Sequence, residues 1–177
     1  IQLTNILDLT DGNTGLPAIE GDNAHRLTIK NGTIERTAGF ESPFRIFLVA
    51  SSGSLIIEDL KVANGSLFGQ QGGCIKNHGL LSVIDSRLEN CESQSINFTQ
   101  DAAGGAIYND GEIPQIIRSF VVNSDGGVGS GIYNANIIGA IACSNIADNG
   151  ANGGGTGGGI YNAGTIGLMT YNIIERN

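Results

Sequence analysis

Three ionisable residues fall at matching places in successive sequence repeats and are the best candidates for catalysis. They are Asp59, Asp85 and Arg118, which alignment of the repeats places one above another in a column. Hydrolysis of a glycosidic bond requires two carboxylates about 5–9.5 Å apart, one acting as acid and the other as nucleophile or base. The one adjacent acidic pair, Glu58-Asp59, is expected to point to opposite faces of a strand. We therefore favour a surface charge ladder, compensated by the arginine, and expect no catalytic site.

Aromatic residues are the candidates for ligand binding. Tyr108, Tyr133 and Tyr161 recur at one place in the repeats, where the alternation of a strand predicts that they face outward. A row of such rings can stabilise the surface by stacking or can form a platform for sugars, and we favour stacking. The other candidate is Phe98, which lies in the otherwise polar segment 91–103.

The tyrosines belong to four copies of one motif. The copies read GGCIKN (72–77), GGAIYN (104–109), GSGIYN (129–134) and GGGIYN (157–162), and their isoleucines are 32, 25 and 28 residues apart. The sequence predicts two structural ladders, one of isoleucines inside the core and one of hydrogen-bonded asparagines. The first ladder comprises Ile75, Ile107, Ile132 and Ile160, and the second comprises Asn77, Asn109, Asn134 and Asn162.

The elements that position these ladders are short strands. Each motif is followed by a polar turn and an apolar stretch, and no segment has the 3.6-residue period of a helix. A single repeat cannot bury its own apolar side, so it must stack on the next. We predict an all-β, right-handed parallel β-helix of about seven rungs, with no helical domain, formed by residues 1–177 as a single domain.

Glycine and the segments between strands add two local predictions. Paired glycines before each isoleucine allow a sharp corner, which Gly-Ser-Gly at 129–131 is expected to interrupt. The insertions at 65–71, 91–103, 124–128 and 150–157 are expected to be loops that project along one edge of the rod. Loops on one edge of a solenoid are where binding usually resides.

The composition excludes several classes of function. Nine Lys and Arg against 17 Asp and Glu give a net charge of −8, and the basic residues form no run. Nucleic acid, which requires clustered cations, is therefore excluded as a partner. We expect no cofactor and no metal site, apart from weak capture of structural calcium by Asp and Asn in the turns. No segment has the ~20 apolar residues that span a bilayer, so this segment is not expected to insert into a membrane.

The three cysteines, Cys74, Cys91 and Cys143, accompany no CxxC motif and no histidine cluster. We interpret all three as small buried hydrophobic residues. The alternative, which requires export to an oxidising compartment, is a Cys74–Cys91 disulfide that leaves Cys143 free.

The GGAIYN and GGGIYN motifs, each followed by a strand ending S-F-x-x-N or N-I-x-x-N, resemble the repeats of chlamydial polymorphic outer-membrane proteins. The layout of the whole chain is similar to that of bacterial surface proteins with right-handed β-helix repeats. This resemblance implies an exported protein that serves as an adhesin, a surface coat or a part of an autotransporter.

These observations predict a non-catalytic structural or adhesive protein that is extracellular or on the cell surface. Apolar strands near both ends suggest head-to-tail stacking of the chain with itself into a filament, unless the chain is a piece of a longer protein. Surface glycans and the surface of a host or neighbouring cell are further predicted partners. The alternative is a β-helix that binds or degrades polysaccharides as a lyase or glycoside hydrolase.

Overall fold

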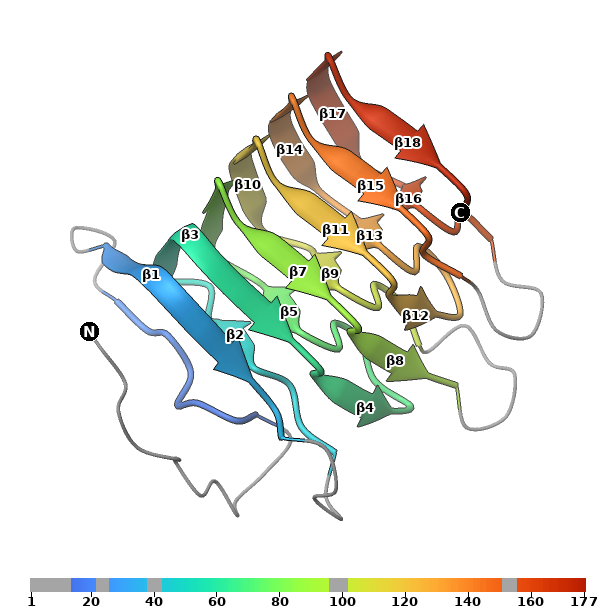
Figure 1. Cartoon of the computed structure of the whole chain (residues 1–177). Coiled ribbons are helices and arrows are strands. Elements are labelled where there is room, and N and C mark those ends of the chain that lie inside the picture. The colour runs from blue at the N-terminus through green and yellow to red at the C-terminus, as the bar shows by residue number, and fades with distance from the viewer. Residues whose placement is uncertain (1–13, 22–25, 38–42, 96–101, 151–155) are drawn as a thin grey trace.

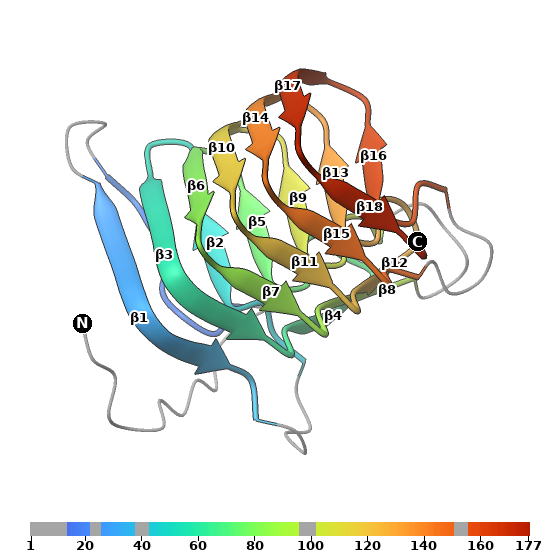
Figure 2. The same ribbon diagram turned by 45° about the horizontal axis from the view of Figure 1, so that its top comes forward.

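The computed structural model describes residues 14–21, 26–37, 43–95, 102–150 and 156–177. Every strand pairing recorded in these residues is parallel, and no helix occurs among them. The strands stack turn upon turn along one axis, so that β1 lies at one end of the molecule and β16, β17 and β18 at the other (Figures 1 and 2). The parallel β-helix that the sequence predicts is confirmed.

Three parallel sheets form the walls of the solenoid. The largest has ten strands, the second five and the third three. The largest sheet contains β1 (Leu27–Glu35), β3 (Ser54–Ala63), β6 (Leu80–Ile84), β7 (Arg87–Glu89), β10 (Glu112–Ile117), β11 (Phe120–Val122), β14 (Ile137–Ala142), β15 (Asn145–Ala147), β17 (Thr165–Thr170) and β18 (Ile173–Glu175). The second contains β2 (Phe47–Val49), β5 (Ile75–Asn77), β9 (Ile107–Asn109), β13 (Ile132–Asn134) and β16 (Ile160–Asn162), and the third contains β4 (Ser66–Phe68), β8 (Glu92–Gln94) and β12 (Asp125–Gly126).

The five strands of the second sheet mark about five turns among the described residues, fewer than the seven or so predicted for the whole chain. Strand β1 pairs with β3 and, together with the isolated bridges Thr14–Arg45 and Ile19–Val49, adds part of a turn before the first complete one. The rung predicted for residues 1–10 lies outside the described residues.

The third sheet corrects the prediction for the inserted segments. Segments 65–71, 91–103 and 124–128 contain β4, β8 and β12, which pair in parallel. These segments were interpreted as loops because two or three residues of strand are too short to give an alternating pattern. Residues 66–68, 92–94 and 125–126 form a third wall of the solenoid, whereas residues 96–101 and 151–155 of the predicted loops lie outside the described residues.

Two columns of residues with positive φ bend the chain within each turn of the largest sheet. The first column comprises Asn31, Asp59, Asp85, Arg118, Cys143 and Tyr171, and the second comprises Asn64, Asn90, Asn123, Asp148 and Arg176, all with φ between 48° and 63°. Asn and Asp are the side chains that tolerate this conformation best. From Asp85 onward the first column divides each apolar stretch into two strands, such as β6 and β7, whereas Asn31 and Asp59 bend the continuous strands β1 and β3.

A third corner depends on glycine. Gly72, Gly104, Gly129 and Gly157 each lie three residues before the motif isoleucine and have φ between 59° and 71°. A Cβ at Gly104 would lie 2.3 Å from the Ile107 carbonyl oxygen, so only glycine fits there. Only the first glycine of each pair has a positive φ. The prediction that Gly-Ser-Gly interrupts the corner was therefore wrong: Gly129 makes the corner, and Ser130 Oγ donates to the Gly126 carbonyl at 2.9 Å.

The core lies inside the walls and consists of stacked aliphatic side chains. Ile75, Ile107, Ile132 and Ile160 pair in register along the second sheet, and the first three are fully buried. Ile160 belongs to the last turn and is partly exposed. Like side chains lie over like side chains because each turn repeats the register of the one before.

Candidate functional sites

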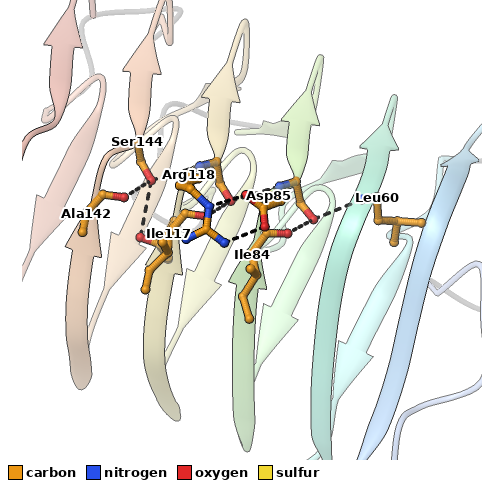
Figure 3. Close-up of polar contacts among 10 residues, drawn as sticks. Leu60, Ile84, Asp85, Ile117, Arg118, Ala142 and Ser144 are labelled. Carbon is orange, nitrogen blue, oxygen red and sulfur yellow. Dashed lines mark hydrogen bonds and ion pairs between the residues drawn. The ribbon is translucent and has the colours of Figure 1, made fainter.

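Asp85 and Arg118 form an ion pair on an exposed corner (Figure 3). The guanidinium donates from Nε to Asp85 Oδ1 at 2.5 Å and from Nη2 to Oδ2 at 2.6 Å. The Arg118 side chain is 57% exposed and that of Asp85 is 42% exposed. Asp59 occupies the same column one turn earlier, as the aligned repeats predict, and its side chain bonds to no described residue.

This corner is poorly suited to general acid catalysis. The hydrogen bond and the charge of Arg118 lower the pKa of Asp85, whereas a carboxylic acid that donates a proton near neutral pH needs a raised pKa. The prediction that Glu58 and Asp59 point to opposite faces was wrong. The chain bends at Asp59 with φ 48°. Both side chains lie on the outer side, where Glu58 is half-buried and Asp59 is exposed. The column therefore forms a bidentate surface ion pair.

The three tyrosines form a continuous stack on the outer face of the second sheet. The ring centroids of Tyr108 and Tyr133 are 5.0 Å apart and those of Tyr133 and Tyr161 are 5.1 Å apart, with interplanar angles of 7° and 14°. The Lys76 ammonium lies 5.5 Å from the Tyr108 ring centroid, at the end of the row. Burial, followed by the Asp110 charge and Tyr133, raises the pKa of Tyr108.

Stacking of the tyrosine rings limits which ring faces a ligand could contact. Tyr133 is covered by a ring on each side, and Tyr108 by a ring and by Lys76, so their faces are not free to receive a sugar. A shallow hollow of about 140 Å³ adjoins the row and is lined by Val128, Tyr133, Thr156 and Tyr161. Phe98, the other candidate, lies outside the described residues.

The motif asparagines form a ladder inside the solenoid. Each Nδ2 donates at 2.7 Å to the Oδ1 of the next asparagine, and the ladder runs through Asn77, Asn109, Asn134 and Asn162. Each of the first three also donates to a main-chain carbonyl of the next turn, at 3.1 or 3.2 Å, the acceptors being Glu112, Ile137 and Thr165. The first three asparagines are fully buried, so these bonds satisfy groups that water cannot reach.

A second ladder follows the first column of bends, and sequence reasoning missed it. The residues that follow the bends at Asp59, Asp85, Arg118 and Cys143 donate their main-chain N–H to a side-chain oxygen of the next turn. Leu60 N–H donates to Ser86 Oγ at 3.2 Å, and Ser86 N–H donates to Ser119 Oγ at 3.1 Å (Figure 3). The series continues from Ser119 to Ser144 Oγ at 3.1 Å and from Ser144 to Asn172 Oδ1 at 2.9 Å.

A third ladder follows the second column of bends. Cys91 N–H donates to Ser124 Oγ at 3.4 Å, Ser124 N–H to Asn149 Oδ1 at 3.1 Å, and Asn149 N–H to Asn177 Oδ1 at 3.1 Å. Bends with positive φ take these N–H groups out of the strand-to-strand pairing, and the side chains supply acceptors in its place. We call the second and third ladders the corner ladders. Both could have been found by aligning the residue that follows each bend.

The cysteines correct another prediction. Cys74 and Cys91 form a disulfide, with 1% or less of either residue exposed, whereas Cys143 is free and exposed. The interpretation of all three as buried hydrophobic residues was wrong, and the disulfide alternative describes the structure. Arg45 is a further residue that the sequence did not single out. It is buried, its Nε and Nη2 donate to the carbonyls of Gly72 and Gln71, and desolvation lowers its pKa to about 10.

The described residues contain no group of three or more His, Cys, Asp or Glu that could hold a metal ion. The weak calcium site therefore remains a prediction with no location. No helix that could span a membrane occurs in the described part of the chain. The fold and these sites define a parallel β-helix held together by internal polar ladders. No protein family model, curated protein or solved structure matches the chain.

Proposed function

We propose that this chain is a rigid, non-catalytic module of an extracellular or cell-surface protein, with a structural or adhesive role. The observation that carries the proposal is the use of the buried polar groups. Three internal ladders join the turns of Ile75, Ile107 and Ile132 each to the next, so these groups stabilise a rod and are turned away from any ligand. A solenoid of this kind presents its outer walls at fixed spacing over its whole length.

The buried disulfide supports the location. Disulfides persist in oxidising compartments and are rare where thiols are kept reduced. Cys74 and Cys91 are both inaccessible, so their bond serves structure and not catalysis of thiol exchange. Export also agrees with the implied similarity to bacterial surface β-helices.

Thiol counting and a glycan assay test this proposal together. The protein is exported to the bacterial periplasm, purified, and denatured with and without reductant before alkylation. We expect one alkylated cysteine without reductant and three with it. Incubation with acidic and neutral polysaccharides is expected to release no reducing ends and no unsaturated sugars. Three free thiols in the exported protein, or polysaccharide cleavage at a rate that scales with protein concentration, would contradict the proposal.

Glycan binding without cleavage is the second candidate, and the hollow beside Tyr133 and Tyr161 favours it. The outer edge of Tyr161 and the Thr156 side chain border this hollow from the last turn. Screening immobilised glycans with the protein and with Tyr161→Ala tests this candidate. Binding that disappears in the variant supports the hollow as the site, and binding unchanged by the substitution excludes it.

A further inference from the structure

Two cations, Arg45 and Lys76, bond to the same residue beside the second sheet. Arg45 lies shortly before β2, and its Nη2 donates to the Gln71 carbonyl at 2.8 Å. Lys76 is the middle residue of β5, and its Nζ donates to Gln71 Oε1 at 3.1 Å. Because like charges repel, holding both cations against one residue costs free energy unless an anion lies near them.

Neither cation forms an ion pair with a carboxylate of the described residues, although the chain has 17 Asp and Glu. Arg45 is 4% exposed, and desolvation lowers its pKa to about 10. Burial, followed by the charge of Arg45, lowers the pKa of Lys76, whereas the charge of Asp110 raises it. Asp110 itself pairs with His78. A buried cation without an anionic partner is costly, so an added anion would stabilise this pair.

Both cations keep donors that a ligand could use. Nε and Nη2 of Arg45 donate to the carbonyls of Gly72 and Gln71, whereas Nη1 bonds to no described residue. Among the described residues, the only fully buried side-chain nitrogen or oxygen without a partner is Asn145 Oδ1, so Arg45 Nη1 retains contact with solvent. The ammonium of Lys76, which is partly exposed, uses one of its three N–H donors on Gln71.

The segment that carries Gln71 is held in place by its neighbours. Gly69 N–H donates to the Gln94 carbonyl at 2.7 Å, and Gly72 N–H donates to the Ala103 carbonyl at 2.9 Å. The disulfide of Cys74 begins two residues after Gly72. Donors that are fixed before binding lose little freedom when a ligand arrives, so this arrangement favours capture of an anion.

We propose that Arg45 and Lys76 form a binding site for the carboxylate or sulfate group of an acidic glycan. Arginine and lysine N–H groups make charge-assisted hydrogen bonds to such oxygens. Tyr108 lies beside the site, with its ring centroid 5.5 Å from Lys76 Nζ, and offers a ring edge to the sugar that carries the anion. This inference deepens the adhesive role and rests on it, since it names the class of glycan.

The competing interpretation is that Arg45 only holds the corner carbonyls and Lys76 only covers the Tyr108 ring. The two interpretations differ in a measurable way. A structural pair binds no acidic sugar, whereas a binding site loses affinity when the ammonium is removed and the fold is kept.

Lys76→Tyr is the test variant, because tyrosine stands at this motif position in the next three turns and the fold accepts it there. Lys76→Arg keeps the positive charge. Lys61→Gln, in β3 of the largest sheet, removes one positive charge elsewhere and is the matched control. Each protein is titrated with trigalacturonate, its methyl ester, sulfated and unmodified maltotriose, and inorganic sulfate. The main-chain amides of Gln71, Gly72 and residue 76 are followed by ¹H–¹⁵N NMR.

We expect an acidic trisaccharide to shift these amides, and Lys76→Tyr to raise its Kd by about tenfold or more. Lys76→Arg and Lys61→Gln are expected to change it by less than about threefold. Tighter binding of trigalacturonate assigns the site to a carboxylate, and tighter binding of the sulfated sugar assigns it to a sulfate.

Three results would overturn the proposal: no shift with either acidic sugar, equal binding of the neutral sugars, or equal losses in Lys76→Tyr and Lys61→Gln. Inorganic sulfate that binds as tightly as the acidic sugars would overturn the assignment to a glycan. None of these results bears on the thiol count or the cleavage assay, so failure here is distinct from failure of the proposed function.

Discussion

Asn109 and Asn162 are the same residue in the same motif and the same sheet, yet their environments differ. Asn109 is fully buried and its amide donates to Asn134 Oδ1 and to the Ile137 carbonyl of the next turn. Asn162 is exposed and donates only within its own turn. In a solenoid, the sequence of a turn sets which groups it can offer, and the neighbouring turn decides whether they contribute to stability.

The largest effect is expected from breaking the inner asparagine ladder. Asn109→Ala removes one acceptor of Asn77 Nδ2, which keeps only the Glu112 carbonyl, and removes the donor to the buried Asn134 Oδ1 and to the Ile137 carbonyl. We expect the free energy of unfolding to fall by about 3–4 kcal/mol. Urea denaturation followed by circular dichroism measures this change. A loss below about 1 kcal/mol would mean that the ladder adds little to the inner turns.

The disulfide sharpens the comparison, because it reinforces an inner turn by covalent means. Cys74 and Cys91 are separated by 17 residues, and closing a loop of about that length contributes about 3 kcal/mol in the chain-entropy model. The double substitution Cys74→Ser and Cys91→Ser is expected to lower the free energy of unfolding by about that amount. Wild-type protein unfolded in the presence of reductant is the control and is expected to match it.

The corner ladder predicts a smaller loss. Ser119→Ala removes the acceptor of the buried Ser86 N–H, and we expect destabilisation of about 1–2 kcal/mol. Ser82, on the outer side of β6, is the matched control, because the same substitution there deletes no recorded ladder bond and is expected to change stability by about 0.5 kcal/mol or less. Equal effects at the two serines would remove the corner ladder from the account.

At the last turn the same kind of substitution is expected to matter least among the ladder residues. Asn162→Ala removes one acceptor of the buried Asn134 Nδ2, which keeps the Asn136 and Thr165 carbonyls, so the expected loss is about 0.5–1 kcal/mol. Parallel urea titrations give the loss in free energy of unfolding for Asn109→Ala and for Asn162→Ala. The ratio of the two losses measures how far the next turn determines the contribution of a ladder asparagine to stability. A ratio near one would contradict the comparison.

The surface ion pair is expected to have the smallest effect, and one that depends on pH. Arg118 lowers the pKa of Asp85 in the folded state, so its stabilisation is present above the unfolded aspartate pKa of about 3.9 and is lost as the pH falls through the lowered folded value. The difference in thermal midpoint between wild type and Asp85→Asn should therefore close at low pH. Asp59→Asn, at a side chain that pairs with no described residue, is expected to show no such difference.

The sequence predicted the fold class and both motif ladders' positions because the I-x-N motif recurs letter for letter. The first corner ladder was harder to see, since its position holds leucine at Leu60, serine in the next three turns and asparagine at Asn172. Short strands such as β12, with two residues, leave no pattern in the sequence.

The column of bends shows the limit more clearly. Arg118, Cys143 and Tyr171 adopt positive φ although their types do not favour it. Only the stacked register places them there, beneath the better-suited Asn31, Asp59 and Asp85 of earlier turns. The residue types of the first turns therefore predict the positive φ of the bends. In the later turns, stacking imposes positive φ on residue types that do not favour it.

The most direct test of the account is hydrogen exchange of the asparagine side chains. In ¹⁵N-labelled protein, the side-chain NH₂ protons of Asn77, Asn109 and Asn134 are expected to exchange with solvent slowly, whereas those of Asn162 exchange rapidly. That result would establish that a following turn is what satisfies the ladder. Rapid exchange at all four asparagines would contradict the account, because it would show that the inner ladder does not shield its amides.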